Sequence, residues 1–174
     1  MSRVEPLLRL VVGVVVERRK AVSRWADTVW RPVAVLGGLP DAAPWTALAS
    51  EGETATYYAG PAEIALYRAE TDSYRRNLLS GAPSIWVALQ ATGGEPPYEI
   101  AVATMDPAEG ESLTEAGQAI VEAVPMPEPL REIIAAFVAE HHVERGFEKR
   151  KRDRADPEAM ARRAPKVGSD DERS

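Results

Sequence analysis

The chain has no cysteine among its 174 residues. It therefore forms no disulfide, has no cysteine-ligated zinc or iron–sulfur site, and offers no thiol nucleophile. Histidine is almost as scarce, with only His141 and His142, side by side. A chain without disulfides is typical of a reducing compartment, so we expect a cytoplasmic protein.

Long apolar runs are also missing. The strongest is Leu10–Val16 (LVVGVVV), far shorter than the roughly 20 residues needed to cross a bilayer. The charged segment Glu17–Lys20 follows it, where a signal peptide would have small residues for cleavage. The sequence thus predicts a buried strand here and no membrane span.

Basic and acidic residues are unevenly distributed along the chain. Of its 21 basic and 27 acidic residues, nine basic and six acidic ones lie in Lys149–Ser174. The preceding body is strongly acidic and would repel nucleic acid, whereas the basic end could meet an acidic partner surface. This distribution disfavours nucleic acid and favours a protein partner.

Strand patterns fill the first two-thirds of the chain. The valine-rich run Leu8–Val16 indicates a strand buried on both faces. Alternating runs on either side of Gly60-Pro61 predict a hairpin, and the 93–97 turn favours antiparallel pairing of the strands that flank it. The expected strands are Leu8–Val16, Val33–Leu36, Glu53–Ala59, Ala62–Ala69, Ser84–Thr92 and Tyr98–Met105.

Helix signals concentrate toward the end. Thr71 is the expected N-cap of a short helix, because its hydroxyl can accept an orphan backbone N–H, and Pro129 suits the first turn of a long helix. The expected segments are a loop over Gly37–Gly52 with one helical turn at Trp45–Ala49, and helices over Thr71–Gly81, from Ser112 or Thr114 to Ala123, and onward from Pro129.

This order of elements predicts an α+β fold. We expect a mainly antiparallel sheet of about five or six strands, with two C-terminal helices packed on it. Residues 1–152 would form a single domain ending in the long helix. Residues 153–174 are rich in alanine, proline, glycine and mixed charge, a composition that predicts a disordered charged tail.

The histidine pair invites a metal-site hypothesis, which helix geometry disfavours. His141 continues an apolar stripe that contains Ile133, Ile134 and Phe137, whereas His142 lies about 100° further round. Neighbouring residues of a helix do not face the same way, so they would not share a metal while the helix continues. We predict a packing role for His141, a surface position for His142 and no metal site.

Two segments are candidates for binding a partner. The cations after Gly146 either complement the negative end of the helix dipole or form an electrostatic handle beside an exposed aromatic residue. Two tryptophans with flanking arginines follow the first strand; Trp30 is expected to anchor a connecting loop onto the sheet, and Trp25 is equally suited to a binding surface. The predicted partner-binding residues are Arg24, Trp25, Phe147, Lys149, Arg150, Lys151 and Arg152.

Several segments together resemble a known family. They read GVVVERRKAVSRWADTVWRPVAVL, ALYRAETDSYRRNL, PSIWVAL, VPMP and HHVERGFEKRKR. They are similar to a bacterial family of unknown function whose genes lie beside those for molybdenum-dependent formate dehydrogenase. Some of its members are labelled molybdopterin-guanine dinucleotide biosynthesis protein. The resemblance implies a role near a molybdoenzyme.

The sequence does not match the guanylyltransferase chemistry which that label suggests. No glycine-rich loop follows the first strand, and no alternating βαβ pattern is present. We therefore expect a non-catalytic accessory protein, without assigned catalytic residues or cofactor, that assists assembly or cofactor loading of the formate dehydrogenase. Its partner would be a molybdoenzyme subunit or its maturation machinery. The alternatives are an enzyme or nucleotide binder in cofactor biosynthesis, and an unrelated interaction module that uses the basic C-terminal helix.

Overall fold

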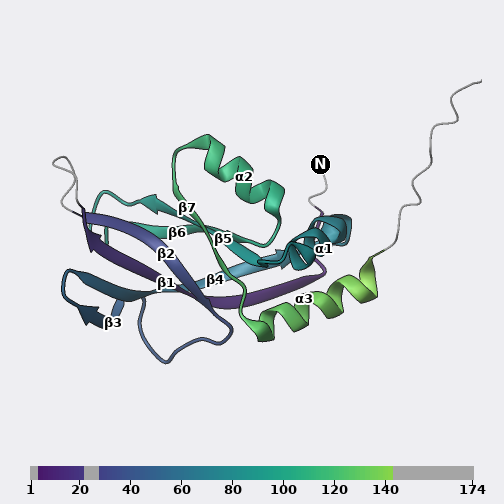
Figure 1. The fold of residues 1–174 in the computed structure, drawn as a ribbon, viewed down its shortest axis with the longest axis horizontal. Helices are drawn as coiled ribbons and strands as arrows, with labels where there is room; N and C mark the ends of the chain where they lie inside the picture. Colours follow the sequence, from purple (N-terminus) through teal and green to yellow (C-terminus); the bar gives the residue numbers. More distant parts are fainter. Residues whose placement is uncertain (1–3, 22–27, 143–174) are drawn as a thin grey trace, which may run out of the picture. The chain divides into compact units, whose positions relative to one another are not determined.

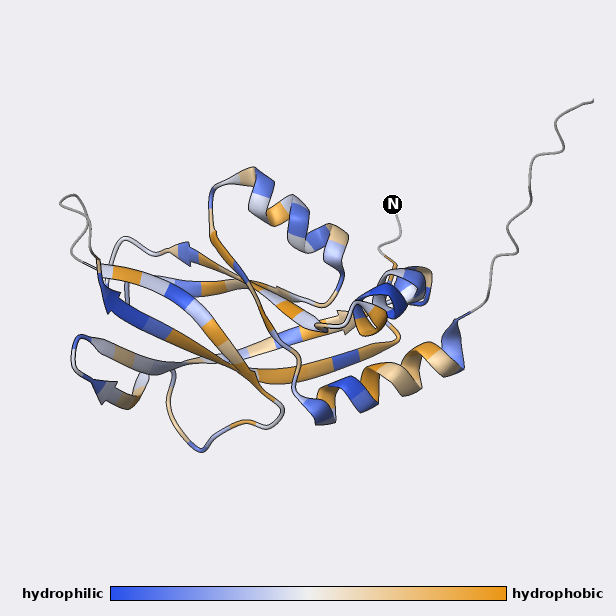
Figure 2. Cartoon of the chain, in the orientation of Figure 1, coloured by the Kyte–Doolittle hydropathy of each residue, from blue (hydrophilic) through white to orange (hydrophobic). Residues whose placement is uncertain are grey.

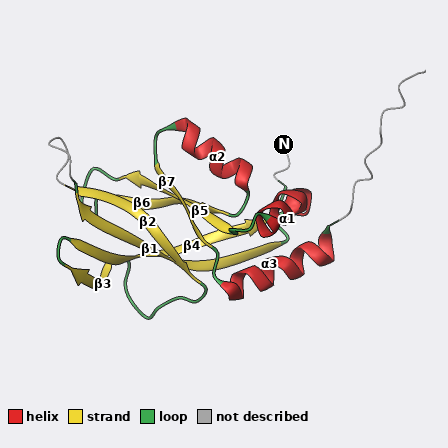
Figure 3. Ribbon diagram, viewed as in Figure 1, coloured by secondary structure: helices red, strands yellow, loops and turns green. Residues whose placement is uncertain are grey.

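The computed structural model describes residues 4–21 and 28–142, and this part of the chain contains seven strands and three α-helices (Figures 1 and 3). The elements are β1 (Leu8–Lys20), β2 (Thr28–Leu36), β3 (Thr46–Glu51), β4 (Thr54–Leu66), the 3-10 turn η1 (Arg68–Glu70), α1 (Thr71–Leu79), β5 (Ser84–Ala91), β6 (Tyr98–Thr104), α2 (Pro107–Ala116), β7 (Ile120–Pro125) and α3 (Glu128–His141). Within these ranges, no helix has the length and apolar character that crossing a membrane requires.

The strands form two antiparallel sheets. The four-stranded sheet has the order β2-β1-β4-β3, and the three-stranded sheet has the order β6-β5-β7. Their inner faces share one hydrophobic core, with β2 next to β7 and β4 next to β6. The prediction of an antiparallel α+β fold is confirmed, but the single sheet with two helices is corrected to two sheets and three helices.

The expected hairpin at Gly60-Pro61 is absent, because β4 runs straight through it. Val14 of β1 lies opposite Gly60, and Val15 lies opposite Tyr58, so Ala59 is an extra residue in the ladder. Gly60 has a φ of 128°, a conformation that glycine adopts without the steric cost of a Cβ. The glycine thus serves a β-bulge, which bends a strand without reversing it.

Two strands, β3 and β7, were not predicted, and β3 replaces the helical turn that was expected at Trp45–Ala49. Every residue of β3 is exposed, so this edge strand lacks an apolar alternation and is held by its ladder with β4. The helix expected to reach Ala123 begins earlier, where Asp106 accepts a hydrogen bond from the amide of Ala108 at 3.0 Å, and it ends at Gly117 with a φ of 67°. The next residues are therefore free to form β7 against β5.

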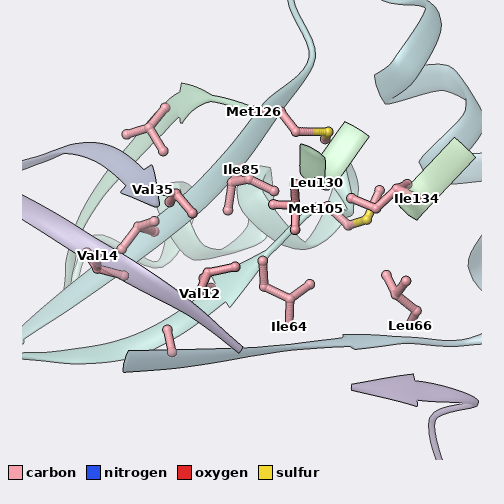
Figure 4. Close-up of a cluster of buried hydrophobic side chains, with 14 of the residues drawn as sticks. Val12, Val14, Val35, Ile64, Leu66, Ile85, Met105, Met126, Leu130 and Ile134 are labelled. Carbon is pink, nitrogen blue, oxygen red and sulfur yellow. The ribbon is translucent and has the colours of Figure 1, made fainter. Parts of the chain in front are cut away.

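The core lies between the two sheets and extends to α3. Side chains from β1, β2, β4 and β5 converge there with Leu130 and Ile134 of α3 (Figure 4). The fully buried side chains include Val12, Val14, Val16, Ile64, Leu66, Tyr74, Ile85, Val87, Leu89, Met105 and Ile134. The first strand is buried on both faces only in its middle, since Arg9 and Val11 are exposed.

The helices α1 and α3 pack together at one end of the sheets. Thr71 is the first residue of α1 and not its N-cap; its hydroxyl donates to the carbonyl of Arg68 at 3.1 Å. Helix α3 presents an apolar face to the core (Figure 2), although Ile133, expected within that stripe, is 43% exposed. The opposite end of β1 turns hydrophilic at Glu17 (Figure 2).

Candidate functional site

An aromatic cluster lies at the end of the sheets away from α1 and α3. It consists of Trp30, Trp45, Tyr57 and Tyr98, all half-buried. The ring of Trp30 is central: its centroid lies 5.9 Å from Trp45, 5.6 Å from Tyr57 and 6.2 Å from Tyr98. Such edge-to-face and tilted pairs stabilise each other while leaving part of each ring available for contact.

Strand registers explain why these rings meet. Trp30 of β2 lies opposite Arg18 of β1, and Tyr57 of β4 lies opposite Val16. Because side chains alternate along a strand, Val16 and Arg18 lie on the same face of the sheet. Tyr98 belongs to the other sheet, at the first position of β6, so the cluster joins the two sheets where the aliphatic core ends.

Trp45 enters the cluster from an unusual backbone conformation. Its φ of 68° is the one positive value among the described non-glycine residues. Its amide donates to the carbonyl of Tyr58, which fixes the residue directly before β3. A bulky residue in the left-handed region costs free energy, and such outliers concentrate at functional sites.

Arg18 lies over two of the rings. Its guanidinium carbon is 5.8 Å from the ring centroid of Trp30 and 5.5 Å from that of Tyr57. These are cation–π distances, at which a partly desolvated arginine gains roughly 0.5–2 kcal/mol. The two contacts hold the guanidinium in place, and no hydrogen bond joins its N–H donors to another side chain of the described residues.

The neighbouring cations are already paired with carboxylates. Glu17 accepts from Arg19 at 2.7 Å and from Arg31 at 3.2 Å, and Lys20 lies 3.3 Å from Glu53. The hydrogen bond from Arg19 lowers the pKa of Glu17, against the opposing effect of burial, and Arg31 lowers it further. Within residues 4–21 and 28–142, Arg18 has no carboxylate at ion-pair distance.

Arg18 and three rings of the aromatic cluster, those of Trp30, Trp45 and Tyr57, line a cleft of about 540 Å³. This volume lies within the range of roughly 300–1,000 Å³ that is usual for ligand pockets. Among the described lining residues, Arg18 and the exposed Glu95 of the β5–β6 turn are the charged ones. The lining residues are Arg18, Thr28, Trp30, Trp45, Tyr57, Glu95, Pro96 and Pro97.

A second polar cluster lies between α1 and α2. Burial raises the pKa of Glu70, and the negative charges of Asp106 and Glu109 raise it further. Glu109 itself accepts a hydrogen bond from the hydroxyl of Thr104 at 2.7 Å. Among the described residues, no group of three or more histidine and acidic side chains is arranged to hold a metal ion.

The two histidines are separated by the end of α3. His141 packs on Phe137 with ring centroids 4.6 Å apart, in keeping with the predicted packing role. His142 follows the last helical residue and is half-buried rather than on the surface; its Nδ1 lies 3.2 Å from the hydroxyl of Thr71. The prediction for His142 assumed that the helix continues through it, with a turn of about 100° per residue. Helix α3 ends at His141, so the position of His142 does not follow from helix geometry.

The predicted partner-binding residues lie outside the described ranges and stay predictions. They are Arg24, Trp25, Phe147, Lys149, Arg150, Lys151 and Arg152. Trp30 lies within β2 and not on a connecting loop. Sequence reasoning missed Arg18, Trp45 and Tyr57 as members of one site. The signal it could have used was the even spacing of Arg18 from Val16 and Val14 along β1.

Comparisons with known proteins identify one family. Neither the curated proteins nor the solved structures contain a match to this chain. A family described as "Protein of unknown function (DUF3305)" matches residues 11–152. This range includes all the described strands and helices except the first three residues of β1, and it includes the described lining of the aromatic cleft. The chain belongs to this family of unknown function.

Proposed function

We propose that this protein is a non-catalytic accessory protein that binds a protein partner through the aromatic cleft. The observation that carries the proposal is Arg18, which lies over Trp30 and Tyr57 in an open cleft and has no ion-pair partner among the residues that the structure describes. Tryptophan, tyrosine and arginine are the residues that most often dominate the binding energy of protein interfaces.

The cleft is suited to recognition because its members are held in place. Trp30 packs against the core as well as against three other rings. A preordered surface loses little side-chain entropy on binding, so more of the contact energy becomes affinity. General acid–base catalysis needs a carboxylate or similar group held against the substrate, whereas Glu95, the carboxylate among the described lining residues, lies exposed on the β5–β6 turn.

The proposed partner is a molybdenum-dependent formate dehydrogenase subunit or its maturation machinery, in the cytoplasm. This choice is supported by the resemblance of segments such as GVVVERRKAVSRWADTVWRPVAVL to a family encoded beside such enzymes. The protein would assist assembly of the enzyme or loading of its cofactor. The lack of cysteine favours the cytoplasmic setting.

The experiment combines co-purification with a deletion strain. Full-length tagged protein should co-purify with the formate dehydrogenase or a maturation factor, and deletion should lower both formate dehydrogenase activity and its molybdenum cofactor content. Normal activity and cofactor content in the deletion strain would contradict the proposal. A truncation before Phe147 tests the basic segment separately: loss of co-purification would assign the contact to that segment instead of the cleft.

A second candidate is a nucleotide binder in cofactor biosynthesis. The same cleft favours it, because aromatic faces stack with heterocyclic bases and an arginine binds phosphate. Calorimetric titration of the full chain with GTP, and separately with molybdopterin, distinguishes the two functions. Absence of heat at millimolar nucleotide removes this candidate.

A further inference from the structure

We propose that the aromatic cleft takes an extended acidic segment of the partner protein, with a carboxylate on Arg18 and a neighbouring aromatic side chain against Trp30 and Trp45. This inference rests on the proposed protein-binding function and adds the chemistry of the bound segment. It assigns the recognition of charge to one residue, which makes it open to a direct test.

Charge complementarity selects the carboxylate. Arg19, Arg31 and Lys20 surround the cleft end of β1, and each has a carboxylate of this chain within 3.3 Å. Among these four cations, Arg18 alone has no carboxylate at ion-pair distance within residues 4–21 and 28–142. It is half-buried, as Arg31 is, and therefore less hydrated than the exposed Arg19 and Lys20. A planar guanidinium with two fixed ring contacts is preordered for a bidentate carboxylate.

The rings select an aromatic neighbour. Trp30 and Trp45 meet edge to face, at an interplanar angle of 78°, and both stay half-buried. Covering the exposed parts of both rings with another ring would complete the burial of two large side chains. Interface residues of this type pair with similar residues on the partner.

The opposite wall fixes how the segment lies. Glu95 is exposed at the β5–β6 turn and would repel a second carboxylate. The acidic side chain must therefore point toward the β1 side of the cleft, and a neutral or basic part of the segment must pass Glu95. The cleft volume of about 540 Å³ holds a few side chains and not a folded domain.

The test begins with a display library of random short peptides, selected on the full-length protein and counter-selected on an Arg18→Gln variant. Enriched peptides should carry aspartate or glutamate beside an aromatic residue. The strongest peptide is then titrated into labelled protein, with the indole N–H signals followed by NMR. The signals of Trp30 and Trp45 should shift, while that of Trp86, which packs against α2, should stay in place.

Variants give the direction of each effect. Arg18→Gln should weaken the peptide about tenfold or more, the range for a hydrogen bond between charged groups. Glu95→Gln should leave affinity unchanged or raise it, because a like charge is removed. Arg9→Gln, on the same strand but paired with Glu63 at 2.7 Å, is the matched control and should have no effect. Circular dichroism and thermal melts confirm that each variant is folded.

Each outcome decides the inference. Enrichment of basic or uncharged peptides, or equal affinity of the Arg18→Gln variant, overturns it. Binding of peptides that shifts Trp86 and not Trp30 overturns it too. If the formate dehydrogenase still co-purifies with the Arg18→Gln variant, the accessory function survives and this inference falls. If acidic peptides bind but no formate dehydrogenase co-purifies, the site stands and the proposed partner falls.

Discussion

Gly110 of α2 lies directly on the indole ring of Trp86 in β5. A Cβ built on this glycine would be 2.3 Å from Cγ and 2.5 Å from Cδ1 of the ring, whereas real Cβ atoms keep beyond about 3.0 Å. The glycine is helical, with its amide bonded to the carbonyl of Asp106 at 3.0 Å. Its role is therefore close approach between a helix and a strand.

Gly110→Ala should destabilise the protein by about 2 kcal/mol or more. The steric cost of overpacking is typically 1–3 kcal/mol and here exceeds the roughly 1 kcal/mol that alanine gains within a helix, because several ring atoms are in the way. Urea unfolding followed by fluorescence measures the difference. Gly38→Ala, where no atom lies within 4 Å, should change stability by less than about 0.5 kcal/mol.

Asn77 joins three segments through its buried amide. It donates to the carbonyls of Ser84 and Met105 at 2.8 and 2.9 Å, and accepts from the amide of Ser84 at 3.0 Å. Asn77→Ala should cost about 1–3 kcal/mol for each polar group left buried and unpaired. Calorimetric melting tests this, with Gln90→Ala on the exposed part of β5 as the control. A melting temperature equal to that of the wild type would refute the assigned role.

Glu70→Gln should stabilise the protein at neutral pH. Burial and the charge of Asp106 raise the pKa of Glu70 above its ordinary value of 4.5, so the folded state disfavours the carboxylate. The wild type therefore loses stability as pH rises from 4.5 through the raised pKa. The gain from the variant should be full at pH 7 and vanish at pH 3.5, as measured by thermal melts across pH. Glu111→Gln, on the exposed side of α2, should show no such dependence.

Tyr74 should ionise well above the ordinary tyrosine pKa of 10.0 in the folded state. Burial raises its pKa from 10.0 to about 12, and its hydroxyl accepts a hydrogen bond from the amide of Tyr67 at 2.9 Å. Tyr74→Phe should cost about 1–3 kcal/mol at pH 8, because this buried amide loses its partner. Absorbance titration of phenolate in the folded protein should lose the phase near pH 12 in the variant.

The same residue predicts how stability changes in alkali. The unfolded tyrosine ionises near pH 10 and the folded one only near 12, so the wild type loses stability between these values. Phenylalanine does not titrate, and the stability gap between the two proteins should shrink over this window. Denaturant unfolding at pH 8, 10 and 11.5 provides the comparison. A gap that stays constant with pH would contradict the assignment.

The sequence by itself determined the antiparallel character of the fold and many of its elements. Residues 84–105 formed the expected pair of strands around the 93–97 turn, and α3 begins beside Pro129 as the proline signal indicated. These elements follow from local rules: alternation of side chains, turn-forming residues and the fixed φ of proline. Local rules also placed His141 on the apolar face of its helix.

Only the tertiary structure decided how the strands pair and which side chains meet across them. Gly60-Pro61 has the composition of a turn, yet pairing with β1 on one side made it a bulge within one strand. The edge strand β3 has no apolar pattern to detect, because no second layer covers it. The aromatic cleft depends on registers between distant strands, which bring Arg18, Trp30 and Tyr57 together. A sequence pattern records which face a residue takes, whereas its neighbour across the sheet is fixed only when the strands pair.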